Sequence, residues 1–250
     1  MVYLLFVAIV QGVTEFLPIS SSGHIVLFEK IFGVGDNTVL LSVILHLGTL
    51  FSVLWYYRKR LVWLVKKPLS KEMLHLIVAT IPASVFVVLF GNFVEKSFGG
   101  GFLWLGFLVS AIMLFVANWV LKKRTTSKPF TWKTALTMGL FQAVAVFPGI
   151  SRSGSTLCAG LFCEADKEEA LDFSFLMSVP IIIASTFFEV VKCNFSTLST
   201  NWLQLIFALA VAFICGLFSI KITTNFTKKI KLSVFGFYLL LLSGVCWFVF

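Results

Sequence analysis

Apolar runs of two lengths alternate along the chain with short polar stretches. Six runs are long enough to cross a bilayer as helices, because a hydrocarbon core of about 30 Å needs roughly 20 apolar residues. The six lie at about 38–57, 74–91, 102–121, 171–191, 203–220 and 232–250. The pattern predicts an all-α polytopic membrane protein with six transmembrane helices.

Shorter apolar runs flank two polar segments that contain Pro, Gly and Ser. Tyr3–Val10 and Ile25–Phe32 enclose the first segment, and about 135–146 and 157–163 enclose the second. A run of about eight residues makes roughly 12 Å of helix, which is too short to span. Such pairs predict two re-entrant helix-loop-helix hairpins, whose irregular backbone must pack inside protein or line a wet cavity.

The two polar segments are copies of one another. The first is QGVTEFLPISSSGH at 11–24 and the second is QAVAVFPGISRSGS at 142–155, and they align without a gap at a shift of 131. Three aligned pairs differ in chemical kind: Glu15 and Val146, Ser21 and Arg152, His24 and Ser155. A duplicated frame with different reactive groups in its two copies is a candidate composite site.

The basic residues between the runs are distributed unevenly. If each hairpin returns to the face it started from, 16 basic residues lie on one side of the membrane and three on the other. An excess of positive charge marks the cytoplasmic side. Each half then holds one hairpin and three spans, and because three is odd the second half is inserted upside down. The sequence predicts a single membrane domain, 1–250, built as an inverted-topology repeat of about 1–121 and about 132–250.

The composition supports a membrane protein and argues against a soluble one. Hydrophobic residues make up 59% of the 250 residues and charged residues 12%, which is too few to cover a soluble domain. The formal net charge of +9 comes from short loops between apolar runs, so we expect no nucleic-acid partner. The five cysteines lack CxxC spacing, which predicts free thiols rather than disulfides or a metal site.

The second polar segment carries the groups of an anion site. Arg152 is a forked, permanently charged donor that suits phosphate oxygens. Ser151, Ser153 and Thr156 offer hydroxyls, and a helix expected to begin near Ser155 would direct its free N–H groups into the tip. The alternative is an arginine that snorkels to the membrane surface above a structural turn. Arginine at membrane depth is costly and usually functional, which favours the anion site.

The first polar segment supplies complementary groups. Glu15 lies four residues after Gln11, on the same helix face, and serines and His24 follow within ten residues of it. A carboxylate, a hydroxyl and an imidazole can serve as base or metal ligand, nucleophile and general acid. The alternatives are a structural ion pair between Glu15 and Arg152 and a neutral histidine in a helix cap. Metal-binding spacing such as HExxH is absent, so an ion would be a hard divalent cation held by carboxylate and phosphate.

Both segments resemble the motifs of the bacterial undecaprenyl-pyrophosphate phosphatase family, the integral-membrane type associated with bacitracin resistance. The likeness rests on QxxxEFLPISSSGH at 11–24 and PGISRSGST at 148–156, and it extends over the whole chain, including LHLGT at 45–49 and FSFLMSVP at 173–180. It implies six spans and two re-entrant helix pairs in an inverted repeat. Many members have Glu where this chain has Gln11, which cannot act as a base and binds a divalent cation more weakly.

The resemblance also implies roles for individual residues. Glu15 would act as base or as ligand of a Mg²⁺ or Ca²⁺ ion, and Arg152 would hold the diphosphate. Ser21 would be the favoured nucleophile and His24 would transfer protons, with attack by His24 or by water left open. Further diphosphate contacts would come from both segments: Gln11, Ser20, Ser22, Ser151, Ser153 and Thr156.

The implied reaction is hydrolysis of undecaprenyl diphosphate to undecaprenyl phosphate and inorganic phosphate. It would take place in the bacterial cytoplasmic membrane at a site reached from the outer face, and it would recycle the lipid carrier of peptidoglycan and confer bacitracin resistance. The competing interpretation is a polyprenyl-phosphate flippase, since inverted repeats with broken midplane helices are typical of transporters. The set of Glu15, Ser21 and His24 favours the enzyme, because translocation does not need it. Polyprenyl diphosphate and membrane lipid are the expected partners, and a homodimer is left open.

Overall fold

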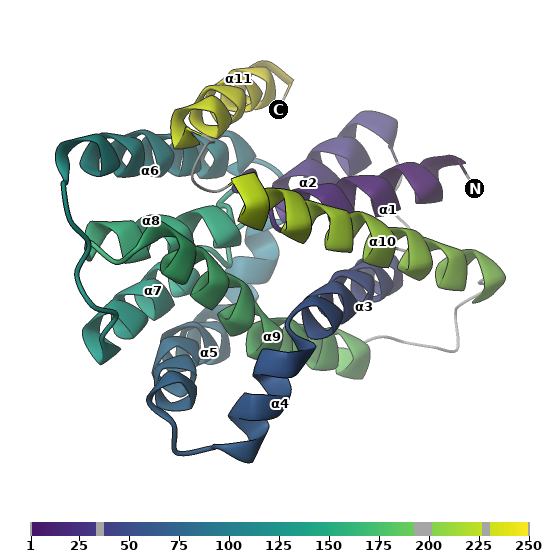
Figure 1. The fold of residues 1–250 in the computed structure, drawn as a ribbon. Helices are drawn as coiled ribbons and strands as arrows, with labels where there is room; N and C mark the ends of the chain where they lie inside the picture. The colour runs from purple at the N-terminus through teal and green to yellow at the C-terminus, as the bar shows by residue number, and fades with distance from the viewer. Residues whose placement is uncertain (1, 34–37, 193–201, 227–230, 250) are drawn as a thin grey trace.

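The computed structural model describes residues 2–33, 38–192, 202–226 and 231–249, and within them the chain is helical with no strand. The predicted all-α class is confirmed (Figure 1). The helices of the first half are α1 (Val2–Thr14), α2 (Ser21–Phe32), α3 (Thr38–Tyr56), α4 (Arg58–Lys66), α5 (Lys71–Ser97) and α6 (Leu103–Lys123). Those of the second half are α7 (Trp132–Val144), α8 (Arg152–Phe162), α9 (Lys167–Lys192), α10 (Trp202–Phe226) and α11 (Leu232–Val249).

The long helices coincide with the six long apolar runs. Five of the described helices are long and apolar enough to cross a membrane, and six if the bent pair of α3 and α4 counts as one span. The chain is therefore a multi-pass membrane protein. Four of its cysteines are free thiols, as predicted, and the fifth, Cys193, lies outside the described residues.

Helix α4 is an element that the sequence pattern does not predict. The basic stretch after the first span suggests a loop, but the chain bends by 77° after α3 and continues as α4. Leu64 is buried, which anchors one side of α4, while Arg58 and Lys67 lie over the rings of Trp55 and Trp63. Basic residues beside tryptophan rings are typical of a membrane–water interface.

The short helices are longer than the apolar runs that predict them. Helices α1, α2, α7 and α8 have 13, 12, 13 and 11 residues, because the polar motif residues are themselves helical. The expected start of α8 near Ser155 is wrong. Helix α8 begins at Arg152, since the Ser151 hydroxyl accepts a hydrogen bond from the Gly154 amide at 3.1 Å and caps the helix there. That these pairs re-enter the membrane remains a prediction.

The helices of the two halves correspond in order and in packing. A shift of 131 carries α1, α2, α3, α5 and α6 onto α7, α8, α9, α10 and α11. Helix α1 packs on α10 while α7 packs on α5, and the matching helices α3 and α9, and α6 and α11, pack on each other. Such an exchange of partners is what a two-fold relation between repeats produces.

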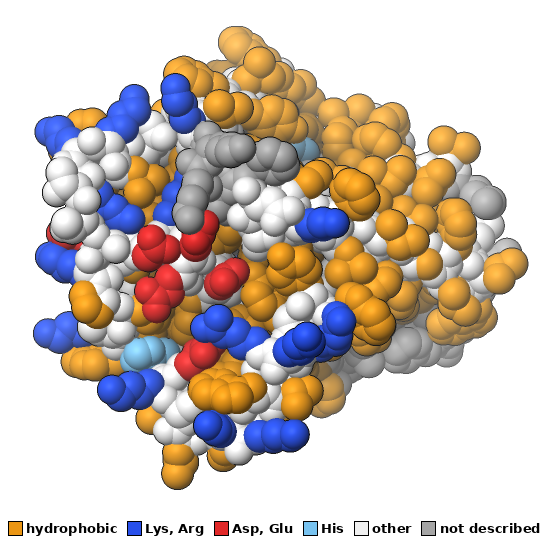
Figure 2. Space-filling view, viewed as in Figure 1, with side chains coloured by type: hydrophobic (Ala, Val, Ile, Leu, Met, Phe, Trp, Pro, Cys, Tyr) orange, Lys and Arg blue, Asp and Glu red, His pale blue; other side chains and the backbone are white. Residues whose placement is uncertain are grey.

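The surface divides into a charged part and an apolar part. Figure 2 shows Lys and Arg side chains at the left and lower edges of the view, and hydrophobic side chains over the upper and right-hand parts. Large hydrophobic residues such as Val88, Phe187 and Phe218 are well exposed, as expected where lipid replaces water. The grouping in space follows the uneven distribution of basic residues along the sequence.

Candidate active site

The two copied segments touch each other in the middle of the molecule. The Ser153 hydroxyl donates a hydrogen bond to the Leu17 carbonyl oxygen at 2.9 Å. A Cβ atom added to Gly154 would lie 3.2 Å from Pro18, and one added to Gly23 would lie 2.9 Å from the Cα atom of Gly149. These two close approaches are equivalent under the shift of 131, so the tips meet across the two-fold relation.

Helix α6 holds the second tip in place. Gly149 has a φ of 85°, a left-handed conformation that favours glycine. The Ser110 hydroxyl donates to the Gly149 carbonyl oxygen at 3.1 Å and accepts from the Ser151 amide at 2.9 Å. A Cβ atom on Gly106 would collide with the Pro148 carbonyl oxygen. The backbone of the second tip therefore rests directly on α6.

The Glu15 carboxylate is the centre of the site. Its Oε1 atom pairs with the Arg152 guanidinium, and its Oε2 atom accepts hydrogen bonds from the Ser21 hydroxyl and, at 3.0 Å, from the Gln11 amide. Glu15 directly follows α1, while Ser21 and Arg152 are the first residues of α2 and α8. Four residues that the sequence singles out thus lie together, and they come from both repeats.

The cluster combines one buried ion pair with two helix N-termini. The side chain of Glu15 is 5% exposed and that of Arg152 is 17% exposed, so each charge depends on the other for compensation. Helices α2 and α8 both begin here, and the positive ends of their dipoles face the cluster. His46 of α3 is a further ionisable neighbour of Glu15. A phosphate group would meet one guanidinium and two helix N-termini.

His24 is held apart from the carboxylate. Its Nδ1 atom donates to the Ser20 carbonyl oxygen at 2.7 Å, and the Tyr238 hydroxyl lies 2.6 Å from Nε2. No hydrogen bond joins His24 to Glu15 or Ser21 in the described part of the chain. Sequence reasoning missed Tyr238, although its position, 131 residues after Phe107, marks it as part of the same duplicated frame.

The remaining predicted hydroxyls lie in contacts within the two segments, between them, and to α9. Those of Ser20 and Ser151 cap α2 and α8. The Ser22 hydroxyl lies 3.5 Å from that of Ser20, and Ser153 makes the bond between the tips. Thr156 donates to the Arg152 carbonyl oxygen at 2.8 Å and lies 2.6 Å from Ser174 of α9. Their part in diphosphate binding remains a prediction.

A cation could draw on a small set of oxygens. The described residues contain no group of three or more His, Cys, Asp or Glu side chains placed to hold a metal ion. Gln11 Oε1 is buried without a hydrogen-bond partner, next to the Glu15 carboxylate. Hard oxygens of this kind suit Mg²⁺ or Ca²⁺, but they fill only part of a coordination shell. These two side chains could supply only part of the shell of a cation, and a bound phosphate would have to supply the rest.

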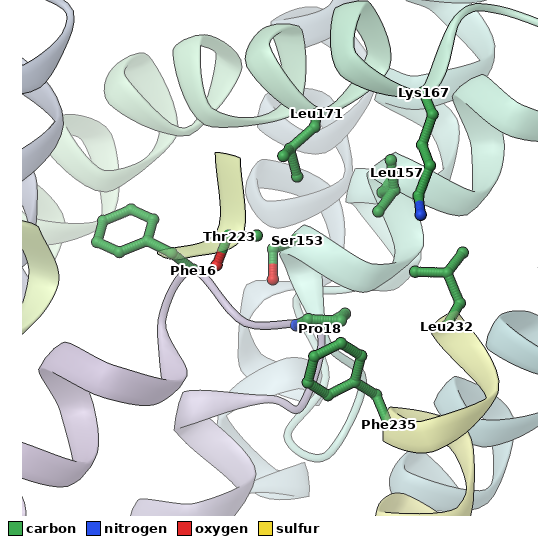
Figure 3. Close-up of a pocket in the computed structure, with 9 residues that line it drawn as sticks. All are labelled: Phe16, Pro18, Ser153, Leu157, Lys167, Leu171, Thr223, Leu232 and Phe235. Atoms are coloured by element: carbon green, nitrogen blue, oxygen red, sulfur yellow. The ribbon is translucent and has the colours of Figure 1, made fainter. Parts of the chain in front are cut away.

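One cavity touches the two tips and another lies away from them, and neither includes the ion pair. Figure 3 shows the smaller, about 20 Å³ in volume, with Phe16, Pro18 and Ser153 from the two tips on one side and Lys167 of α9 reaching in from the other. It has room for about one water molecule. The larger, about 430 Å³, lies between α4, α5 and α9 and is almost wholly apolar. Neither is lined by Glu15 or Arg152.

Comparison with known proteins assigns the chain to a family. The model of the bacitracin resistance protein BacA family matches residues 4–245. Undecaprenyl-diphosphatase 3 of Bacillus cereus is 41% identical over 234 residues, covering 92% of this chain and 90% of that protein. The undecaprenyl-diphosphatase of Thermosipho africanus is 38% identical, covering 96% and 97%, and that of Methanococcus maripaludis is 37% identical, covering 96% of both. With both copied segments inside the matched region, the chain belongs to the bacitracin resistance protein BacA family.

Proposed function

We propose that this protein hydrolyses undecaprenyl diphosphate to undecaprenyl phosphate and inorganic phosphate. The observation that carries the proposal is the Glu15 carboxylate, which binds the Ser21 hydroxyl and the Arg152 guanidinium at once. A nucleophile beside a base, next to a cation suited to phosphate, is what phosphoryl transfer requires. The names of the relatives give the substrate class.

Ser21 is the proposed nucleophile. Its oxygen attacks the terminal phosphorus while its proton passes to Glu15, the bond to the bridging oxygen breaks, and undecaprenyl phosphate leaves. Water then cleaves the phosphoserine and releases inorganic phosphate, with His24 as the proposed proton carrier. Arg152 and the two helix N-termini offset the charge on the transferring phosphoryl group. The products recycle the lipid carrier of envelope polymers, which would account for bacitracin resistance.

A divalent cation, Mg²⁺ or Ca²⁺, is proposed to bind together with the substrate. Glu15 and the unpartnered Oε1 atom of Gln11 would hold it, and phosphate oxygens and water would complete its shell. Such an ion would neutralise charge on the diphosphate. Chelation with EDTA should stop phosphate release and added Mg²⁺ should restore it; full activity in EDTA would remove the cation from the proposal.

The cytoplasmic membrane is the proposed location, with a site open to the outer face. The support is the predicted topology, in which the basic stretches lie inside and the first tip enters from outside. The lipid tail would stay in the bilayer while the headgroup reaches the tips.

The test is phosphate release by the purified protein in detergent from farnesyl and undecaprenyl diphosphates. Arg152→Ala should lower the rate about 100- to 1000-fold or more, because it removes the main charge on the phosphoryl group. Arg60→Ala is the matched control, since Arg60 pairs with Glu72 at 2.7 Å on the surface. Near-normal turnover by Arg152→Ala would overturn the assignment. Lipid flipping in liposomes without phosphate release would favour the transporter instead.

A further inference from the structure

The imidazole of His24 is fixed at both ring nitrogens. A carbonyl oxygen can only accept, so the 2.7 Å contact with Ser20 places the ring proton on Nδ1. The Nε2 atom of a neutral ring then has a lone pair, and the Tyr238 hydroxyl, 2.6 Å away, donates to it. Tyr238 therefore completes the hydrogen bonding of a histidine that is only 3% exposed.

The same tyrosine also fixes the plane of the ring. The rings of Tyr238 and His24 are stacked, with an interplanar angle of 9° and centroids 5.7 Å apart. Phe107 meets His24 edge-on at 5.9 Å. Phe107 lies on α6 and Tyr238 on α11, at equivalent positions of the two repeats (107 + 131 = 238). Each repeat thus places one aromatic ring against His24, and only the second carries a hydroxyl.

Tyr238 separates His24 from the outside of the molecule. It is 41% exposed on α11, whereas His24 beneath it is buried. With Nε2 occupied by a donor, the ring is held in one tautomer and one orientation. A histidine that carries protons depends on both properties, and with Nδ1 donating to Ser20 it is Nε2 that would exchange a proton, by way of the Tyr238 hydroxyl.

We propose that Tyr238 is a positioning residue for His24, which holds the imidazole with its proton on Nδ1 and its ring plane fixed. The effect on turnover rests on the proposed phosphatase function. The hydrogen bond itself does not, so the two can be tested separately.

The variant that tests the proposal is Tyr238→Phe, which keeps the ring and removes only the hydroxyl. Tyr56→Phe is the matched control, because Tyr56 has its hydroxyl 3.0 Å from that of Thr224, on an exposed surface between α3 and α10. Tyr238→Phe should lower kcat about tenfold, the size expected for one hydrogen bond, and leave KM within about twofold. Tyr56→Phe should leave kcat and KM as they are.

Nitrogen-15 NMR of histidine-labelled protein in detergent detects the hydrogen bond between His24 and Tyr238 through the chemical shifts of the ring nitrogens. The chain has three histidines, so His24→Gln assigns the His24 signals by their loss. Tyr238→Phe should move the Nε2 signal of His24 and leave the other two histidines in place, and Tyr56→Phe should move none. Unchanged His24 signals, or equal losses of kcat in both variants, would overturn the proposal. A shifted signal in a protein that releases no phosphate would support the positioning contact and overturn the phosphatase assignment.

Discussion

The two copied segments share the same helix–turn–helix order and carry different chemical groups. In the first, the Gln11 amide donates to Glu15 four residues on. In the second, the equivalent amide of Gln142 is buried with no partner for either polar atom, because Val146 stands where the carboxylate would be. The duplication has kept the glutamine in both places, but only the first copy gives its side chain a hydrogen-bond partner.

The same contrast holds at the start of the following helices. His24 has both ring nitrogens bonded, whereas the equivalent Ser155 has a buried hydroxyl without a partner. Ser21 and Arg152 occupy equivalent positions and bind opposite oxygens of one carboxylate. The comparison teaches that the two copies hold equivalent residues in equivalent places, and that their chemistry differs at three aligned positions.

The largest effect should come from breaking the ion pair between the copies. Glu15→Ala and Arg152→Ala should each lower phosphate release about 100- to 1000-fold or more. Each should also lower the free energy of unfolding by about 3–5 kcal/mol, since each leaves a buried charge unpaired. The double variant should regain much of the stability but none of the activity. Thermal unfolding and phosphate assays on all three variants check this. Equal stability of the single and double variants would show that leaving either charge unpaired costs little.

Alanine substitution at equivalent positions of the two copies should separate residues needed for turnover from residues that are not. His24→Ala should lower phosphate release about 100-fold or more, the usual scale for a lost general acid or base. Ser155→Ala removes a hydroxyl that bonds to nothing, so its rate should stay within about twofold of the unaltered protein. A comparable loss in both variants would mean that the copies contribute equally.

A structural hydroxyl should affect stability more than turnover. Thr156→Val removes the 2.6 Å contact with Ser174 that joins α8 to α9, and should lower the free energy of unfolding by about 1–2 kcal/mol. The KM for farnesyl diphosphate decides between this role and substrate contact. A KM raised tenfold or more would place Thr156 against the diphosphate.

The smallest effect should come from the unpartnered amide. Gln142→Met keeps the approximate volume and removes a buried polar group, so the free energy of unfolding should stay level or rise by up to about 1 kcal/mol. Gln11→Met removes a bond to Glu15 and should lower both stability and turnover. Melting temperatures in one detergent compare the two variants. A strong destabilisation by Gln142→Met would reveal a partner for the amide, such as a buried water.

Much of the fold was predictable because length and hydrophobicity decide what can cross a bilayer. The six long runs match α3, α5, α6, α9, α10 and α11. The meeting of Glu15 with Arg152 followed from the shift of 131, which places both at the tips. Helix α4 was missed, since a basic stretch after a span suggests a loop until the burial of Leu64 is known.

The contact of His24 with Tyr238 was beyond sequence reasoning for a different reason. It joins residues 214 positions apart and depends on how α6 and α11 pack against each other. No periodic pattern in the sequence indicates how these two helices pack. The serines were predicted as phosphate ligands because hydroxyl groups suit that role. In the structure, the hydroxyls of Ser20 and Ser151 cap helices α2 and α8.

Ser21 and Arg152 occupy equivalent positions of the two halves. This limits how such a chain could have arisen and how it can be rebuilt. A protein made of the first half twice would bring two carboxylates to the meeting point and no guanidinium. One made of the second half twice would bring two arginines with no acid between them. Neither homodimer could assemble the centre described here, so the two halves must stay fused, or be expressed together, to form a working pair.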